Sequence, residues 1–122
     1  MRADCHMHTY FSGDSEAKPE DMVLAAIDKG LEAICFTDHE DIDYFCDDIE
    51  FVFDPETYFK ELGALKEKYK EKLDIRIGVE FGLQPHLAKK AKAFTAANPY
   101  DFVIGSMHVV GGKDPYYPEF FE

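Results

Sequence analysis

Apolar residues follow two kinds of pattern, which alternate along the chain. Short apolar runs or period-two alternations predict strands over residues 2–8, 31–39, 74–82 and 100–110. Between them, apolar residues recur at three- and four-residue spacing over residues 19–29, 55–69 and 85–98, which predicts three amphipathic helices. Alternation of strand and helix is typical of an α/β protein with about four parallel strands, here in a single domain over residues 1–122.

Turn and capping residues indicate where the helices begin and end. Pro19 stands at a first helical position and Gly30 follows the last turn of the same helix. Asp54-Pro55 begins the second helix. Gln84-Pro85 opens the third helix, and Asn98-Pro99 ends it because proline cannot continue a helix.

Side chains able to bind a metal ion stand near the carboxyl ends of all four predicted strands. His6 and His8 are two residues apart, so a strand places them on one face. His39, Glu80 and His108 come at or near the ends of the next three strands. Because ligands gather at the carboxyl ends of parallel strands, these five side chains are expected to form one site. The alternative is that these histidines fall there by chance.

The charge of the chain limits which classes of molecule can bind at such a site. Thirteen basic and twenty-five acidic residues give a formal charge of −12, which argues against binding nucleic acid. Eight acidic residues lie between Asp38 and Asp54, where no lysine or arginine occurs. This segment is either a solvated loop or a lid that retains cations near the site. A small phosphorylated substrate remains compatible with an acidic protein because bound metal ions supply positive charge.

The same composition indicates the compartment. The chain has no apolar run of about eighteen residues and no signal peptide, so we expect a cytoplasmic protein without a membrane partner. Cys5, Cys35 and Cys46 form no Cys-x-x-Cys pair and are expected to be reduced thiols. We interpret Cys5 and Cys35 as small buried side chains and not as nucleophiles.

Four short motifs resemble a known family. They are residues 4–9 with 12–14, then 36–39, 78–80 and 105–108. Their residues, order and separation are similar to those of the polymerase-and-histidinol-phosphatase (PHP) family of metal-dependent phosphoesterases. The run from Gly111 to Phe121 resembles the histidinol-phosphatase branch.

The resemblance implies a fold and a set of ligands. Members of the family are distorted (β/α)7 barrels with up to three divalent metal ions, variously zinc, manganese or iron, so this chain would form part of such a barrel. By resemblance the metal ligands are His6 and His8 for the first ion, Glu80 as a bridge to the second, His108 for the second, and Asp14 and His39 for the third. Asp38 and Ser106 would orient His39 and its neighbours.

The implied activity is hydrolysis of a phosphomonoester, L-histidinol phosphate in histidine biosynthesis, by a metal-bound hydroxide. Glu80 and His108 would be the catalytic residues. Two alternatives stay open: a nucleotide phosphoesterase or nuclease on the same scaffold, and a metal-binding domain without turnover.

The chain departs from the family in length. It stops at Glu122, where the family continues with further strands, metal ligands and basic groups for the substrate. We expect one of three explanations: part of a longer phosphatase, a half-barrel that closes by forming a homodimer, or a non-catalytic binding domain.

Overall fold

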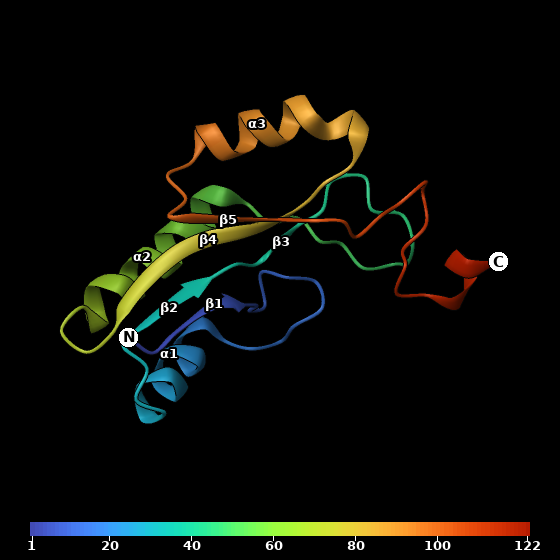
Figure 1. Cartoon of the computed structure of the whole chain (residues 1–122). Helices are drawn as coiled ribbons and strands as arrows, with labels where there is room; N and C mark the ends of the chain where they lie inside the picture. Colours follow the sequence, from blue (N-terminus) through green and yellow to red (C-terminus); the bar gives the residue numbers. More distant parts are fainter.

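The computed structural model describes all 122 residues, and its strands form one parallel sheet (Figure 1). β1 (Ala3–Met7) pairs with β2 (Ala33–Phe36), and β2 pairs with the first half of β4 (Asp74–Gly82). The second half of β4 pairs with β3 (His39–Glu40) and with β5 (Phe102–Ser106). This open parallel sheet, together with the helices described below, confirms the expected α/β fold.

The three predicted helices are confirmed. They are α1 (Pro19–Asp28), α2 (Pro55–Tyr69) and α3 (Ala88–Ala97). α2 begins as expected, because the Asp54 side chain accepts a hydrogen bond from the Thr57 backbone N–H at 3.0 Å. The third helix opens with a single 3-10 turn, η1 (Pro85–Leu87), and a second such turn, η2 (Pro118–Phe121), ends the chain.

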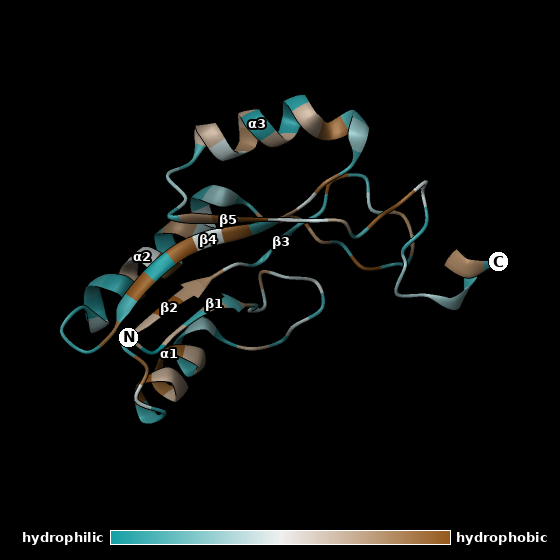
Figure 2. Cartoon of the chain, in the orientation of Figure 1, coloured by the Kyte–Doolittle hydropathy of each residue, from teal (hydrophilic) through white to brown (hydrophobic).

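The core lies between the helices and one face of the sheet. Alternate apolar residues of β4 face it, and in Figure 2 this strand shows brown stretches interrupted by teal. α1 and α2 cover this face with buried side chains that include Val23, Tyr58 and Leu62. α3 adds Phe94, whose ring centroid lies 5.5 Å from that of Phe81. Burial of these apolar side chains stabilises the packing of the helices on the sheet, and this packing fixes the positions of the strand ends.

No helix covers the opposite face of the sheet. A hollow of about 360 Å³ lies there, lined by residues that include Ala3, Cys5, Cys35 and Phe102. Cys35 is buried, which raises the pKa of its thiol to about 12, but Cys5 is exposed. Our expectation that both cysteines are buried is therefore wrong for Cys5, because nothing packs over its side of β1. None of the three cysteines forms a disulfide.

The predicted strand over residues 31–39 is interrupted. β2 ends at Phe36 and β3 begins at His39. Between them, the fully buried side chains of Thr37 and Asp38 bond to the end of β1 and to the residues after it: the backbone N–H of Met7, the last residue of β1, donates to Thr37 Oγ1, and the Thr9 hydroxyl donates to Asp38. A continuous apolar pattern did not reveal this break, because the interruption arises from tertiary hydrogen bonds.

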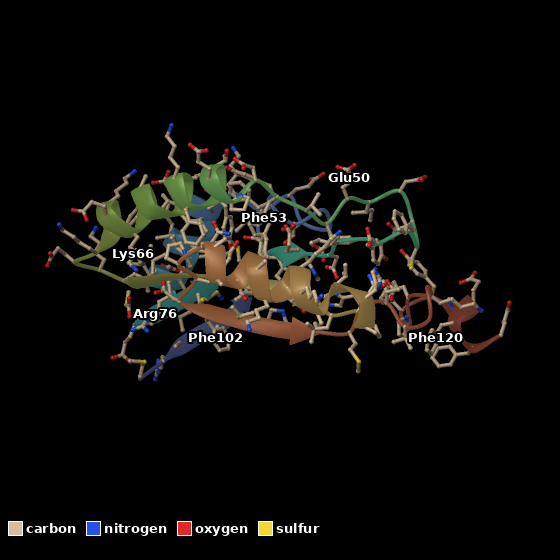
Figure 3. All side chains as sticks on the ribbon, turned by 90° about the horizontal axis from the view of Figure 1, so that it is seen from above. Glu50, Phe53, Lys66, Arg76, Phe102 and Phe120 are labelled. Carbon is tan, nitrogen blue, oxygen red and sulfur yellow. The ribbon has the colours of Figure 1, made fainter.

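The prediction over residues 74–82 is confirmed as β4, but the first and the last predicted strands are shortened. β1 ends one residue before His8, and its register with β2 shifts between Asp4 and Met7. β5 covers Phe102–Ser106, so His108 lies in the loop that follows it. In Figure 3 the end of the molecule that carries this loop also carries Phe120, and the labelled basic residues Lys66 and Arg76 lie at the opposite end.

None of the helices is both long and apolar enough to cross a bilayer.

Candidate metal centre

The six side chains predicted as metal ligands come together where the strands end. Their nitrogen and oxygen atoms form three overlapping groups, each with all its atoms within 4.8 Å of one another. The groups are His6, His8 and Glu80; His8, Asp14 and His39; and His39, Glu80 and His108. Because His8, His39 and Glu80 each belong to two groups, the groups form one continuous cluster.

Glu80 stands at the centre of the cluster. β4 carries it on the face opposite the helices, and only 4% of the residue is exposed. The Nε2 atoms of His6 and His8 lie 2.9 and 2.8 Å from its Oε2 atom, and Nε2 of His108 lies 3.1 Å from Oε1. The two oxygens of one carboxylate thus face imidazole nitrogens from two segments far apart in the sequence, the end of β1 and the loop after β5.

Asp14 and His39 extend the cluster beyond the turn after β1. Asp14 Oδ2 lies 3.5 Å from His39 Nε2 and 3.8 Å from His8 Nδ1. Both distances exceed a normal hydrogen bond, so Asp14 is not bonded to either ring, whereas the rings of His8 and His39 pack against each other with their centroids 4.3 Å apart. The Asp14 side chain is also 42% exposed, which makes this the open side of the cluster.

Asp41 belongs to the same cluster, although our sequence analysis did not single it out. Its Oδ2 atom lies 3.0 Å from Nδ1 of His39 and its Oδ1 atom 2.7 Å from Nδ1 of His108. The carboxylate therefore holds both rings so that their Nε2 atoms point towards Glu80. The signal in the sequence was the two-residue spacing from His39, which a short strand places on the same face.

The electrostatics of the cluster follow from these contacts. Burial alone would raise the pKa of Glu80, but hydrogen bonds from His108, His8 and His6 outweigh it and hold that pKa well below its usual range. The same balance lowers the pKa of Asp41, where burial is outweighed by hydrogen bonds from His108 and His39. In turn, hydrogen bonds to Asp41 and Glu80 raise the pKa of His108 to about 10.

The two residues expected to orient His39 behave differently. Asp38 is fully buried and accepts from the hydroxyls of Thr9 and Ser12, and Ser12 Oγ in turn accepts from the His39 backbone N–H at 2.9 Å. Asp38 thus fixes the backbone at His39 and does not contact the ring. For Ser106 the structure shows a hydrogen bond of the backbone oxygen, from the Leu83 N–H, and the role expected for its side chain stays a prediction.

The acidic segment combines buried and exposed side chains. Asp38, Glu40 and Asp41 are buried, and the others lie at or near the surface, so the segment is more than a solvated loop. The fifth histidine of the chain, His86, pairs instead with Asp43 at 2.9 Å and stands outside all three ligand groups.

Comparison with known proteins agrees with this arrangement. Residues 4–122 match the PHP domain family. The chain is 37% identical over 115 residues to a histidinol-phosphatase of Lactococcus lactis, a match that covers 94% of the chain and 42% of the relative. It is 36% identical to a probable histidinol-phosphatase of Clostridium acetobutylicum, covering 95% of the chain and 43% of the relative. The chain therefore spans less than half the length of these relatives.

Solved structures show the same fold. The crystal structure of histidinol phosphate phosphatase from Lactococcus lactis, complexed with zinc, L-histidinol and phosphate, superposes with a TM-score of 0.85 at 38% identity. This match covers 91% of the chain and 41% of that protein. A putative histidinol phosphatase from Listeria monocytogenes shares the fold with a TM-score of 0.80 at 23% identity, covering 89% of the chain and 46% of that protein. From the match over residues 4–122 and the shared fold, the chain belongs to the PHP domain family.

Proposed function

We propose that the chain carries the metal-binding part of a metal-dependent phosphomonoesterase that hydrolyses L-histidinol phosphate to L-histidinol and phosphate. One observation supports this most strongly: three ligand groups share His8, His39 and Glu80 in a chain that belongs to the PHP domain family. The relatives that are named histidinol-phosphatases match over nearly the whole chain, which favours this substrate over other phosphate esters.

The chemistry of the side chains fits divalent metal ions. Four imidazoles and two carboxylates supply the mixture of nitrogen and oxygen ligands that suits zinc, manganese or iron better than magnesium or calcium. We propose that His6, His8, Asp14, His39, Glu80 and His108 hold up to three such ions. Bound divalent ions would acidify a water molecule and neutralise the charge on the phosphate oxygens.

The side chains of this chain would prepare that chemistry. Glu80 would bridge two ions, because its two oxygens face different histidines. Asp41 would keep the Nδ1 atoms of His39 and His108 occupied, so that each ring offers Nε2. We propose Glu80 and His108 as the catalytic residues.

We propose that the reaction takes place in the cytoplasm, because the three free thiols suit a reducing compartment.

A second candidate is metal binding without turnover. The His6 side chain is 55% exposed and that of Asp14 42% exposed, whereas a phosphatase site excludes bulk water when the substrate is bound.

A homodimer is one way to cover the exposed side of the cluster. β1 and β5 each pair along a single edge, and Phe102 and Val103 of β5 are exposed. Light scattering on the purified chain tests the dimer, and a monodisperse monomer would exclude it.

Phosphate release tests the proposed function. The full chain, loaded with zinc or manganese, is expected to release phosphate from L-histidinol phosphate faster than from p-nitrophenyl phosphate, and Glu80→Gln is expected to abolish release. A chain that binds metal by elemental analysis but releases no phosphate from either ester would favour the non-catalytic candidate. Equal or faster release from nucleoside monophosphates would favour the nucleotide phosphoesterase.

A further inference from the structure

One hydrogen bond is missing from the ladder that joins β3 to β4, directly before the candidate metal centre. The Glu80 backbone N–H donates to the Asp38 carbonyl oxygen at 3.0 Å, as in a regular parallel ladder. The preceding bond of such a ladder would run from the Asp38 N–H to the Gly78 carbonyl oxygen, and it does not form. The strand pairs on either side of this gap keep the same register, so neither strand carries an extra residue.

The hydroxyl of Tyr58 takes the place of the missing bond. It donates to the Gly78 carbonyl oxygen at 3.0 Å, and it accepts from the Asp38 backbone N–H, whose nitrogen lies 3.4 Å away. A hydroxyl can do both because it has one proton and two lone pairs. Tyr58 thus satisfies the two backbone groups that the gap would otherwise leave buried without partners.

Packing of the core holds the Tyr58 ring in the position from which its hydroxyl reaches the gap. Tyr58 belongs to α2, which packs against β4, and the residue is fully buried. The ring centroids of Phe53 and Phe11 lie 4.3 and 5.1 Å from that of Tyr58. Burial raises the pKa of the Tyr58 hydroxyl, so it keeps the proton that it donates. The core therefore fixes this hydroxyl before any metal ion is bound.

We propose that Tyr58 is a positioning residue for the candidate metal centre, because its inserted hydroxyl sets the separation of the strands that carry His39 and Glu80. His39 follows Asp38 directly, and Glu80 comes two residues after Gly78. The gap that Tyr58 fills is thus the last step of the ladder before the two side chains. This inference rests on the proposed metal centre and adds to it a residue from outside the ligand cluster.

The spacing of the two side chains agrees with such a role. His39 Nε2 lies 3.8 Å from Glu80 Oε2, which is too far for a hydrogen bond. This distance is within the span of two zinc–ligand bonds of about 2.0–2.2 Å each, and both side chains belong to one of the ligand groups. A direct bond between Asp38 and Gly78 would draw the strands together at this point and bring the two side chains closer.

The inserted hydroxyl can be tested in the natural, metal-free chain without any substitution. A backbone hydrogen bond transmits a scalar coupling from the amide nitrogen to the carbonyl carbon, which NMR detects. We expect this coupling from the Glu80 nitrogen to the Asp38 carbonyl, and none from the Asp38 nitrogen to the Gly78 carbonyl. A coupling between Asp38 and Gly78 would overturn the inference, because the two groups would then be bonded directly.

The effect on the metal centre is tested with Tyr58→Phe, which removes the hydroxyl and keeps the ring. Tyr100→Phe is the matched control, because the Tyr100 hydroxyl is buried without a hydrogen-bond partner and its ring stacks on Phe94 in the core. Competition with a chromophoric chelator measures zinc affinity, and the visible spectrum of the cobalt-loaded chain reports the coordination geometry. Circular dichroism measures the folded fraction, so that both readouts are compared for folded protein.

We expect Tyr58→Phe to weaken zinc binding by about 10–100-fold, the range observed when a group that orients a metal ligand is lost, and to shift the cobalt spectrum. Tyr100→Phe should leave both unchanged. The inference is overturned if folded Tyr58→Phe keeps the natural zinc affinity and cobalt spectrum, or if Tyr100→Phe changes both to the same extent. If Tyr58→Phe does not fold, the couplings in the natural chain still decide whether the hydroxyl is inserted. Absence of phosphate release with these effects intact would contradict only the proposed function.

Discussion

Asp41 occupies the space that a side chain on Gly82 would fill. A Cβ atom on Gly82 would collide with the Asp41 carboxylate. The same carboxylate holds Nδ1 of His39 and of His108, at 3.0 and 2.7 Å. The bare backbone at the end of β4 therefore permits the contact that orients two of the four imidazoles.

Gly82→Ala is expected to weaken zinc binding by about 10–100-fold, the range observed when a group that orients a metal ligand is lost. The new methyl group displaces Asp41 and frees the two rings. Competition with a chromophoric chelator measures the affinity. Gly63→Ala is the matched control, because a Cβ there has no atom within 4 Å and α2 gains a better helix former. Unchanged zinc affinity in Gly82→Ala would show that Asp41 does not orient the ligands.

His8→Ala is expected to lose most of the bound zinc, because His8 belongs to two of the three ligand groups. His86→Ala removes a histidine of the same chain that pairs with Asp43 outside the cluster, and its zinc content should equal that of the natural chain. Elemental analysis after gel filtration gives metal per chain. Full zinc content in His8→Ala would refute the ligand assignment.

The clustering of these side chains could be predicted because the chemistry of each side chain and its position near the end of a strand agree. His6, Glu80 and His108 are metal-binding types near strand ends, and the parallel sheet brings those ends together. Asp41 could not be told apart in the sequence from the seven other acidic residues between Asp38 and Asp54. Its role depends on the space above Gly82, which is a tertiary contact that no local pattern encodes.

The fold class followed from the alternation of patterns, but the details of the strands did not. The break between β2 and β3 comes from hydrogen bonds of Thr37 to the end of β1 and of Asp38 to the segment that follows it. The exposure of Cys5 arises because no element covers that face of the sheet. Both features depend on which segments meet in space, whereas periodicity reports only which residues of one segment share a face.

Zinc affinity is expected to rise with pH. In the metal-free chain, contacts with Asp41 and Glu80 raise the pKa of His108 to about 10, and the hydrogen bond to Glu80 raises that of His8. The His108 ring then holds a proton at neutral pH that zinc must displace, so affinity should increase by about tenfold per pH unit between pH 6 and 9. Asp41→Asn removes the largest cause of the His108 shift and should flatten this dependence. An affinity independent of pH would contradict the shifts.

Glu40 gives the protein a second dependence on pH, in the stability of the fold. The residue is buried beside the proposed metal ligand His39, and the Phe53 backbone N–H donates to its carboxylate at 3.1 Å. Burial raises the pKa of Glu40 from 4.5 to about 7. Since the folded chain binds this proton more tightly than the unfolded chain, stability falls as pH rises from about 4.5 to about 7, and the loss persists above that range.

Glu40→Gln is therefore expected to stabilise the metal-free chain at pH 8 and to change little at pH 4.5. The raised pKa corresponds to roughly 3 kcal/mol at full effect, and the glutamine oxygen still accepts from Phe53 without a buried charge. Urea unfolding in the presence of a chelator measures the free energy of unfolding at both pH values. Glu71→Gln, an exposed glutamate after α2, should stay within about 0.5 kcal/mol of the natural chain at both. If Glu40→Gln destabilised the chain equally at pH 4.5 and pH 8, the Glu40 carboxylate would be contributing a favourable contact and not a buried charge.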